Sequence, residues 1–415
     1  MKKTKICTLK NGMKVIFYQD TSKHRAVANL FVKFGEKNKQ VKLDNSLFEI
    51  KDGTAHFLEH LLIEHSIYGN ALIEFEKNHA RFNGCTNKDV TEFYIDSVCN
   101  FEDDLIKLIN IVNKPNFKDV HIEETKPAII KEIMMNKDNK FADLYKLDYE
   151  CLFKNIKYSN ILGDISDIES INFRYIKECY EIFYNVENQI LFISGNFNIN
   201  KIKRILENAY NKNIKKEKNY ELIKEVEPNE IVKKEAFIKK DVHIDYIRLT
   251  YKVNISHLTN KEQVKLTFYL NYFLSYLFNS SSKLYNDLVK EKICDYNIDY
   301  SYGLDDKYML VTIGTYTNNS DKLIKKIKKT IKNKKLDQED FELNKKQTII
   351  DLILREDNLD NCIGPFISNV LEYNYYYMDT IKDIENQNFK DYQKIINELD
   401  FSNYCITKMV KKDKN

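Results

Sequence analysis

The spacing of hydrophobic positions along the chain predicts a mixture of β-strands and amphipathic helices. Residues 246–253 alternate apolar and polar side chains, which is typical of a half-buried strand. Residues 6–20 predict a hairpin that turns at Asn11-Gly12, because this pair suits the positive φ values of a tight hairpin turn. Further strands are expected at 26–34 and from Gln189, and helices are expected at 101–112, 123–135, 172–183, 198–210 and 261–278.

Two stretches of the first half recur in the second half at a nearly constant offset. Residues 104–107 resemble residues 322–325, and residues 128–134 resemble residues 348–354. Each stretch follows an alternating strand, over 92–98 in the first half and over 308–313 in the second. Long-period self-similarity of this kind indicates a repeated supersecondary unit, so the chain is expected to hold two copies of one fold.

Chain length supports the same organisation. A chain of 415 residues is too long for one hydrophobic core and suits two domains. Residues 211–229 are rich in Lys and Glu and contain few apolar residues, which indicates a linker between the domains. We expect an α+β fold of two homologous domains, each an antiparallel-rich β-sheet flanked by α-helices. The predicted bounds are 1–213 for the first domain, 214–231 for the linker and 232–415 for the second domain.

The strongest chemical signal is the His-x-x-Glu-His sequence of residues 56–60. On a helix that starts near Thr54, His56 and His60 lie four residues apart, project from one face and can bind one zinc ion. Glu59 lies close enough to that face to take a proton from the attacking water. This order of residues is the inverzincin signature. The alternative is an ordinary buried helix, but burying these side chains without a metal would be costly.

A catalytic zinc ion needs a third protein ligand, for which Glu132 is the candidate. It lies in a helical stretch, residues 128–135, on a stripe that is otherwise half apolar. The alternative is an ordinary surface glutamate. Pro127 is expected to disturb the helix just before it.

These residues resemble the insulinase/pitrilysin superfamily of zinc peptidases, which includes the mitochondrial processing peptidase. Its pattern is His-x-x-Glu-His followed by a glutamate in a later helix. The resemblance covers nearly the whole chain and is closest to the short bacterial members. Further matching segments are residues 9–15, 83–86, 91–94, 189–197 and 281–288.

The resemblance implies a zinc-dependent endopeptidase with one Zn²⁺ per chain in the first domain, and a metal-free second domain that contributes substrate contacts. The peptide substrate adds as a strand to a sheet edge in members of this family. The implied metal ligands are His56, His60 and Glu132, and the implied catalytic base is Glu59. The implied substrate contacts are Asn83, Thr86 and Tyr296.

The resemblance also implies a partner chain, because longer members enclose the substrate with four modules and this chain has two. The partner is either a related subunit, giving a heterodimer, or a second copy, giving a homodimer. Thr125 and Val289 stand where the family often has Glu and Arg. These departures leave an alternative open, a non-catalytic accessory subunit that binds peptides and retains a metal site.

Composition argues against several other classes of protein. With 65 basic and 62 acidic residues the net charge is +3, which gives no field that would select nucleic acid or a membrane surface. The eight cysteines contain no Cys-x-x-Cys pair, which argues against a disulfide framework. No apolar run suits membrane insertion. A reducing cytoplasm is the expected location.

Overall fold

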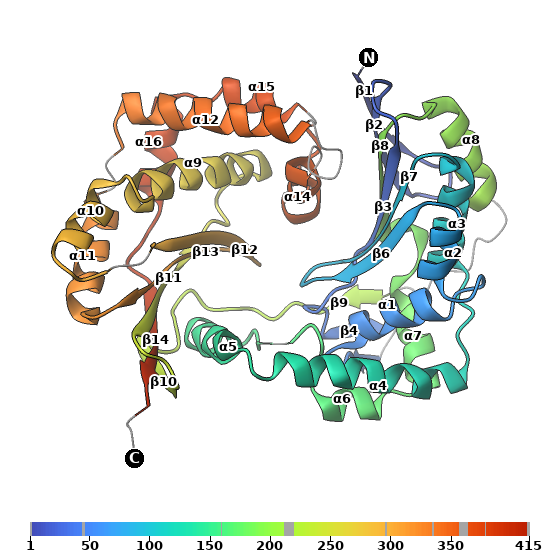
Figure 1. Cartoon of the computed structure of the whole chain (residues 1–415), viewed down its shortest axis with the longest axis horizontal. Helices are drawn as coiled ribbons and strands as arrows, with labels where there is room; N and C mark the ends of the chain where they lie inside the picture. Colours follow the sequence, from blue (N-terminus) through green and yellow to red (C-terminus); the bar gives the residue numbers. More distant parts are fainter. Residues whose placement is uncertain are drawn as a thin grey trace. The chain divides into compact units, whose positions relative to one another are not determined.

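The computed structural model describes residues 2–43, 46–158, 160–210, 220–294, 297–333, 336–356, 364–377 and 379–412. The chain divides into two compact units, each a β-sheet with packed helices (Figure 1). Unit 1 comprises Met1–Asp138 and Ser159–Lys224, and unit 2 comprises Asn139–Tyr158 and Glu225–Asn415. The predicted α+β class with antiparallel-rich sheets is confirmed.

The main sheet of unit 1 has six strands in the order β1-β2-β8-β3-β7-β6. Only β2 and β8 pair in parallel among these strands. The predicted hairpin forms between β1 and β2, and Gly12 in its turn has a φ of +89°. Strand β6 has one neighbour and forms an edge of the sheet. The strands are β1 (Lys2–Thr8), β2 (Lys14–Asp20), β3 (Ala26–Val32), β6 (Arg81–Thr86), β7 (Thr91–Ser97) and β8 (Gln189–Gly195).

Helices α1, α2, α3 and α8 lie on one side of this sheet in Figure 1. Their apolar side chains meet those of the strands in one core, in which Phe57 and Leu61 of the first helix are fully buried. A small second sheet joins β4 (Gln40–Leu43), β5 (Ser46–Glu49) and β9 (Tyr220–Leu222). The helices of unit 1 are α1 (Thr54–Glu64), α2 (Ala71–Lys77), α3 (Phe101–Asn113), α4 (Asp119–Asn136), α6 (Ile165–Ser170), α7 (Phe173–Phe183) and α8 (Ile199–Tyr210).

Unit 2 repeats this strand topology. Its sheet has the order β10-β14-β11-β13-β12, in which the first pair is parallel and the others are antiparallel, as in β2-β8-β3-β7-β6 of unit 1. The duplication that the internal similarity predicted is therefore present in the fold. The strands are β10 (Glu235–Lys240), β11 (Asp245–Asn254), β12 (Asp299–Asp305), β13 (Tyr308–Thr317) and β14 (Tyr404–Lys411).

The two faces of the unit 2 sheet are covered by different helices. Ile247, Leu249 and Tyr251 on β11 belong to one core with side chains of α9 and α11. The alternate residue Thr250 faces α5, where its hydroxyl donates to the buried Asp148 carboxylate at 2.8 Å. The helices are α5 (Lys140–Leu152), α9 (Asn260–Phe278), α10 (Lys283–Lys290), α11 (Ser320–Asn333), α12 (Gln338–Glu356), α14 (Gly364–Tyr373), α15 (Thr380–Glu385) and α16 (Phe389–Glu398).

A buried ion pair ties the start of unit 2 to its sheet. Lys252 Nζ donates to Glu227 Oε1 at 2.8 Å, and both side chains have no exposed surface. Glu227 also accepts the backbone N–H groups of Lys154, Asn155 and Ile156. Residues 139–158, assigned from sequence to the first domain, thus lie with unit 2. Glu227 is buried although it falls in the predicted linker, whose residues 214–219 lie outside the described residues.

Pro127 does not interrupt the helix that carries Glu132, so the expected disturbance was wrong. Helix α4 runs unbroken from Asp119 to Asn136 with Pro127 inside it. A proline removes one hydrogen bond, here to the carbonyl of Glu123. Glu123 and Pro127 are both exposed, so water can take over the released carbonyl.

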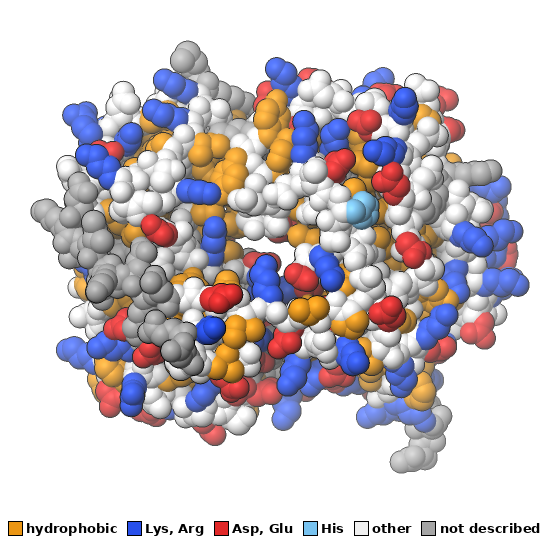
Figure 2. Space-filling model, turned by 180° about the vertical axis from the view of Figure 1, so that it is seen from behind, with side chains coloured by type: hydrophobic (Ala, Val, Ile, Leu, Met, Phe, Trp, Pro, Cys, Tyr) orange, Lys and Arg blue, Asp and Glu red, His pale blue; other side chains and the backbone are white. Residues whose placement is uncertain are grey.

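Surface charge and helix hydrophobicity are the features that would indicate nucleic-acid or membrane partners. Basic and acidic side chains are interspersed on the face shown in Figure 2. None of the helices in the described part of the chain has the length and apolar character needed to cross a bilayer. None of the seven cysteines in that part forms a disulfide. Location in the cytoplasm stays a prediction.

Candidate metal site

Helix α1 carries both histidines of the motif and begins at a position that requires glycine. Gly53, which precedes the helix, has a φ of +79°, and a Cβ there would lie 2.5 Å from the Leu162 carbonyl oxygen. From this start, His56 and Glu59 are directed into the unit, each with 7 % of its surface exposed. His60 projects from the same face as His56, one turn later.

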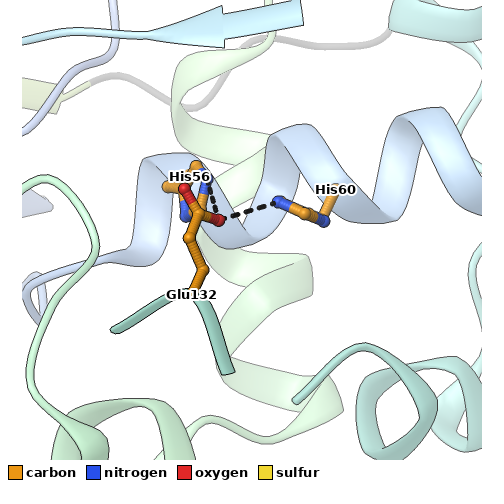
Figure 3. Close-up of side chains that lie close together, drawn as sticks. All are labelled: His56, His60 and Glu132. Carbon is orange, nitrogen blue, oxygen red and sulfur yellow. Dashed lines mark ion pairs between the residues drawn. The ribbon is translucent and has the colours of Figure 1, made fainter. Parts of the chain in front are cut away.

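Glu132 extends from α4 towards the two imidazole rings, as Figure 3 shows. Its Oε2 atom lies 3.5 Å from His56 Nε2 and 3.8 Å from His60 Nε2. Ligands about 2.0–2.2 Å from a tetrahedral zinc ion are separated by about 3.4 Å, so the distances from Glu132 Oε2 to both imidazole nitrogens are close to those expected between zinc ligands. The Glu132 side chain is 41 % exposed, which leaves one side of the group open to solvent.

The electrostatics leave His56 ready to bind a cation. Burial, and secondarily the neighbouring His60, lower the pKa of His56 to about 4. Its ring is therefore neutral at pH 7 and keeps the lone pair that a metal requires. Burial acts to lower the pKa of His60 as well, but the hydrogen bond with Glu64 and the negative charges of Glu64, Glu59 and Glu132 together outweigh it, so the net shift is upward.

Glu64 orients His60. The Glu64 carboxylate lies 2.9 Å from His60 Nδ1, so Nδ1 carries the proton and Nε2 is the nitrogen that faces Glu132. A carboxylate behind a histidine is the usual arrangement that orients a metal ligand. The described residues offer no such partner to His56, whose buried Nδ1 has no hydrogen-bond partner.

Glu59 is held beside the metal-ligand group without belonging to it. The hydroxyl of Thr86 on β6 donates to Glu59 Oε2 at 2.6 Å. Burial raises the pKa of Glu59, which the hydrogen bond from Thr86 partly offsets. Gly84 on the same strand makes room for this carboxylate, since a Cβ there would lie 2.9 Å from both Cγ and Oε1 of Glu59.

The predicted site residues fall into three groups. His56, His60 and Glu132 come together, with one potential ligand atom from each within 4.8 Å of the others. Thr86 is buried and bonded to Glu59, while Asn83 is exposed on β6, where its side chain accepts the Gly84 N–H. Tyr296 lies outside the described residues.

Glu64 and the glycine beside the base are two residues of the site that were not predicted from the sequence. Glu64 follows His60 by four residues on the same helix, so the i,i+4 rule for helix neighbours could have identified it. The close approach of Gly84 to Glu59 depends on the packing of β6 against α1, for which the sequence carries no local signal.

Comparison with known proteins is decisive for the family. Residues 14–159 match the family model described as insulinase (peptidase family M16), and residues 170–348 match the one described as peptidase M16 inactive domain. The chain belongs to the insulinase/pitrilysin superfamily. It is 27 % identical over 393 residues to the uncharacterized zinc protease YmfH of Bacillus subtilis strain 168, covering 94 % of this chain and 90 % of that one. It is 24 % identical over 417 residues to the zinc protease PqqE of Helicobacter pylori, covering 93 % and 90 %.

Solved structures agree on the fold. An M16-like peptidase from Alicyclobacillus acidocaldarius superimposes with a TM-score of 0.89 at 19 % identity, over 99 % of each chain. Pitrilysin superimposes with a TM-score of 0.75 at 15 % identity, over 100 % of this chain but 45 % of that one. The first half of the Escherichia coli periplasmic protease PqqL superimposes with a TM-score of 0.69 at 14 % identity, over 99 % of this chain and 92 % of that one. The chain thus matches one half of longer members. The zinc-protease relatives support a peptidase-type function that depends on zinc.

Proposed function

We propose that this chain is a zinc-dependent endopeptidase with one catalytic zinc ion per chain. The observation that carries the proposal is the convergence of His56 Nε2, His60 Nε2 and Glu132 Oε2 beside a buried carboxylate, Glu59, that is left out of the ligand group. Two histidines and one glutamate form a known donor set of catalytic zinc sites, in which water or substrate takes the fourth position.

The residues of the chain divide the chemistry between them. His56, His60 and Glu132 would hold the metal, which when bound would supply Lewis-acid chemistry by lowering the pKa of water to about 7 and polarising the scissile carbonyl. Glu59 takes the proton from the attacking water, and the hydrogen bond from Thr86 to its Oε2 atom holds the carboxylate in place. Glu59 then returns this proton to the leaving amine. Its raised pKa favours the step, because a base works best with a pKa near the working pH.

The peptide is proposed to add as a strand to β6, the edge strand that carries Asn83 and Thr86. Main-chain hydrogen bonds supply most of the affinity in this mode of recognition, so it tolerates many side chains. Gly84 on the same strand packs against Glu59, so a peptide paired with β6 runs beside the proposed base. The metal-free unit 2 is proposed to contribute further substrate contacts.

We further propose that a second chain completes the enzyme. The chain covers 45 % of pitrilysin, and a closed, water-poor chamber favours this chemistry. Val289, which is 37 % exposed on α10, replaces the arginine common in the family and favours a related subunit over a second copy. The purified chain should show weak peptidase activity that rises when the partner is added. A fully active monomer in sedimentation would contradict this assembly.

The alternative function is an accessory subunit that binds peptides and keeps a metal site without cleaving them. Thr125, fully buried where the family often has a glutamate, is the feature that favours it. A quenched fluorescent peptide separates the two functions, tested on the chain alone and with its partner. Hydrolysis that a chelator abolishes and added zinc restores supports the peptidase, and binding without hydrolysis in both preparations supports the accessory subunit.

A further inference from the structure

Helices α1 and α4 carry a second group of potential metal ligands, apart from the group in Figure 3. It consists of His65, which directly follows α1, and of His121 and Glu124 in the first two turns of α4. One potential ligand atom from each lies within 4.8 Å of the others. We propose that this group binds a second divalent transition-metal ion, of the zinc class.

His65 supplies the atom that most clearly lacks a partner. Its Nε2 is buried and makes no hydrogen bond. The carboxylates of Glu64 and Glu124 each lie 4.0 Å from this nitrogen, too far for a hydrogen bond. A cation placed between His65 Nε2 and the carboxylates of Glu64 and Glu124 would give the nitrogen a bonding partner and balance the negative charge of the carboxylates.

His121 must change its proton position to take part. The backbone N–H of Lys118 donates to His121 Nδ1 at 3.0 Å, so the neutral ring carries its proton on Nε2. When Nε2 binds a metal, this proton moves to Nδ1, which then no longer accepts the Lys118 N–H. Lys118 is exposed, so its N–H can donate a hydrogen bond to water instead. The His65 and His121 rings are now stacked, 8° from parallel, and must tilt because a metal lies in the plane of each ring that binds it.

The donor set determines the class of ion. Two imidazoles and one carboxylate suit zinc, cobalt or nickel, whereas magnesium and calcium prefer oxygen ligands alone. The Glu124 side chain is 56 % exposed, so water can reach the site and complete the coordination.

The second site lies too far from the first to share a reaction with it, but one residue connects them. Glu124 precedes Glu132 by eight residues, about 12 Å along a helix, against about 4 Å between the metals of a two-metal catalytic centre. Glu64 places one oxygen 2.9 Å from His60 Nδ1 and the other 4.0 Å from His65 Nε2. An ion beside His65 attracts Glu64 away from His60, so excess zinc is expected to lower peptidase activity.

Titration of the full-length chain with zinc sulfate, read by native mass spectrometry, tests the second site without an activity assay. The wild type should bind two zinc ions. Glu124→Gln should bind one, because the amide is a poor zinc ligand. Glu123→Gln changes the adjacent carboxylate, which is also exposed and lies outside the ligand group; this variant is the matched control and should bind two.

The outcome is independent of the proposed function. His56→Ala removes a ligand of the first site and should still bind one ion at the second, so failure at one site is distinguishable from failure at the other. A wild type that binds one ion at saturation, with that ion lost in His56→Ala, overturns the second site. Retention of two ions by Glu124→Gln also overturns it.

Discussion

Replacing Gly84 by alanine should impair catalysis while leaving the metal in place. The added Cβ would lie 2.9 Å from Glu59 Cγ and 2.8 Å from Ile63 Cδ1, whereas ordinary contacts are 3.4–4 Å. The Ile63 methyl group is the end of a flexible side chain and can rotate away. Cγ of Glu59 sits in the middle of its side chain, so the carboxylate must move by about 0.5 Å or more, which is the positional tolerance of a catalytic group.

The expected loss in kcat is about 10- to 100-fold, since a displacement of about 1 Å can cost about 100-fold. Zinc content should stay at the wild-type level because no ligand is touched. Gly303→Ala is the matched control: it lies on β12, the topological counterpart of β6, and a Cβ there would meet nothing within 4 Å. Turnover of a quenched peptide, zinc content and the thermal midpoint should be measured on both variants. Wild-type kcat in a folded, zinc-loaded Gly84→Ala protein would refute the placement of Glu59 as the base.

Two further predictions concern groups that support the site and the fold. Glu64→Ala should lower zinc affinity by about 10- to 100-fold, measured by competition with a chelator, because His60 loses the group that orients it; Glu64→Gln keeps an acceptor and should lose less. Glu227→Gln should destabilise the fold by about 3–5 kcal/mol in chemical denaturation, because it leaves the ammonium of Lys252 buried without its counter-charge. Burial acts to raise the pKa of Glu227, but its hydrogen bonds with Lys252 and the backbone lower it overall. The contribution of ionised Glu227 to the stability of the fold is therefore fully present above pH about 4.3, the pKa of a glutamate in the unfolded chain. This contribution is lost as the pH falls through the lower pKa of Glu227 in the folded protein. The variant should lack this acid-dependent loss, and an identical loss in both proteins would contradict the assignment.

Local patterns were sufficient for the elements that carry the candidate site. The Asn11-Gly12 hairpin and the α1 helix follow from turn chemistry and from helical spacing, and both are present as predicted. His56 and His60 could be predicted from their four-residue spacing alone. Glu132 could be predicted as a carboxylate on the partly apolar stripe of a second helix. The internal repeat was visible because both copies keep the same apolar positions.

Interactions between distant segments were not predictable in this way. Helix α5 follows α4 in sequence but packs on the sheet of unit 2, where Asp148 accepts from Thr250 and Thr407, more than one hundred residues away. From the sequence alone, an acidic residue on a helix such as Asp148 is predicted to be exposed, because its hydrogen-bond partners are not known. The effect of Pro127 was predicted wrongly for a related reason, because the carbonyl left without a helical donor belongs to Glu123, whose exposure the sequence did not show.

The most direct test of the central claim is the Glu59→Gln variant, measured for bound zinc and for peptide hydrolysis in the same preparation. Glu59 is not a ligand, so the variant should hold about one catalytic zinc ion per chain while losing nearly all turnover. Glu132→Gln provides the contrast, because it should lose most of this zinc. Hydrolysis by Glu59→Gln at a near wild-type rate, or loss of its zinc, would contradict the account.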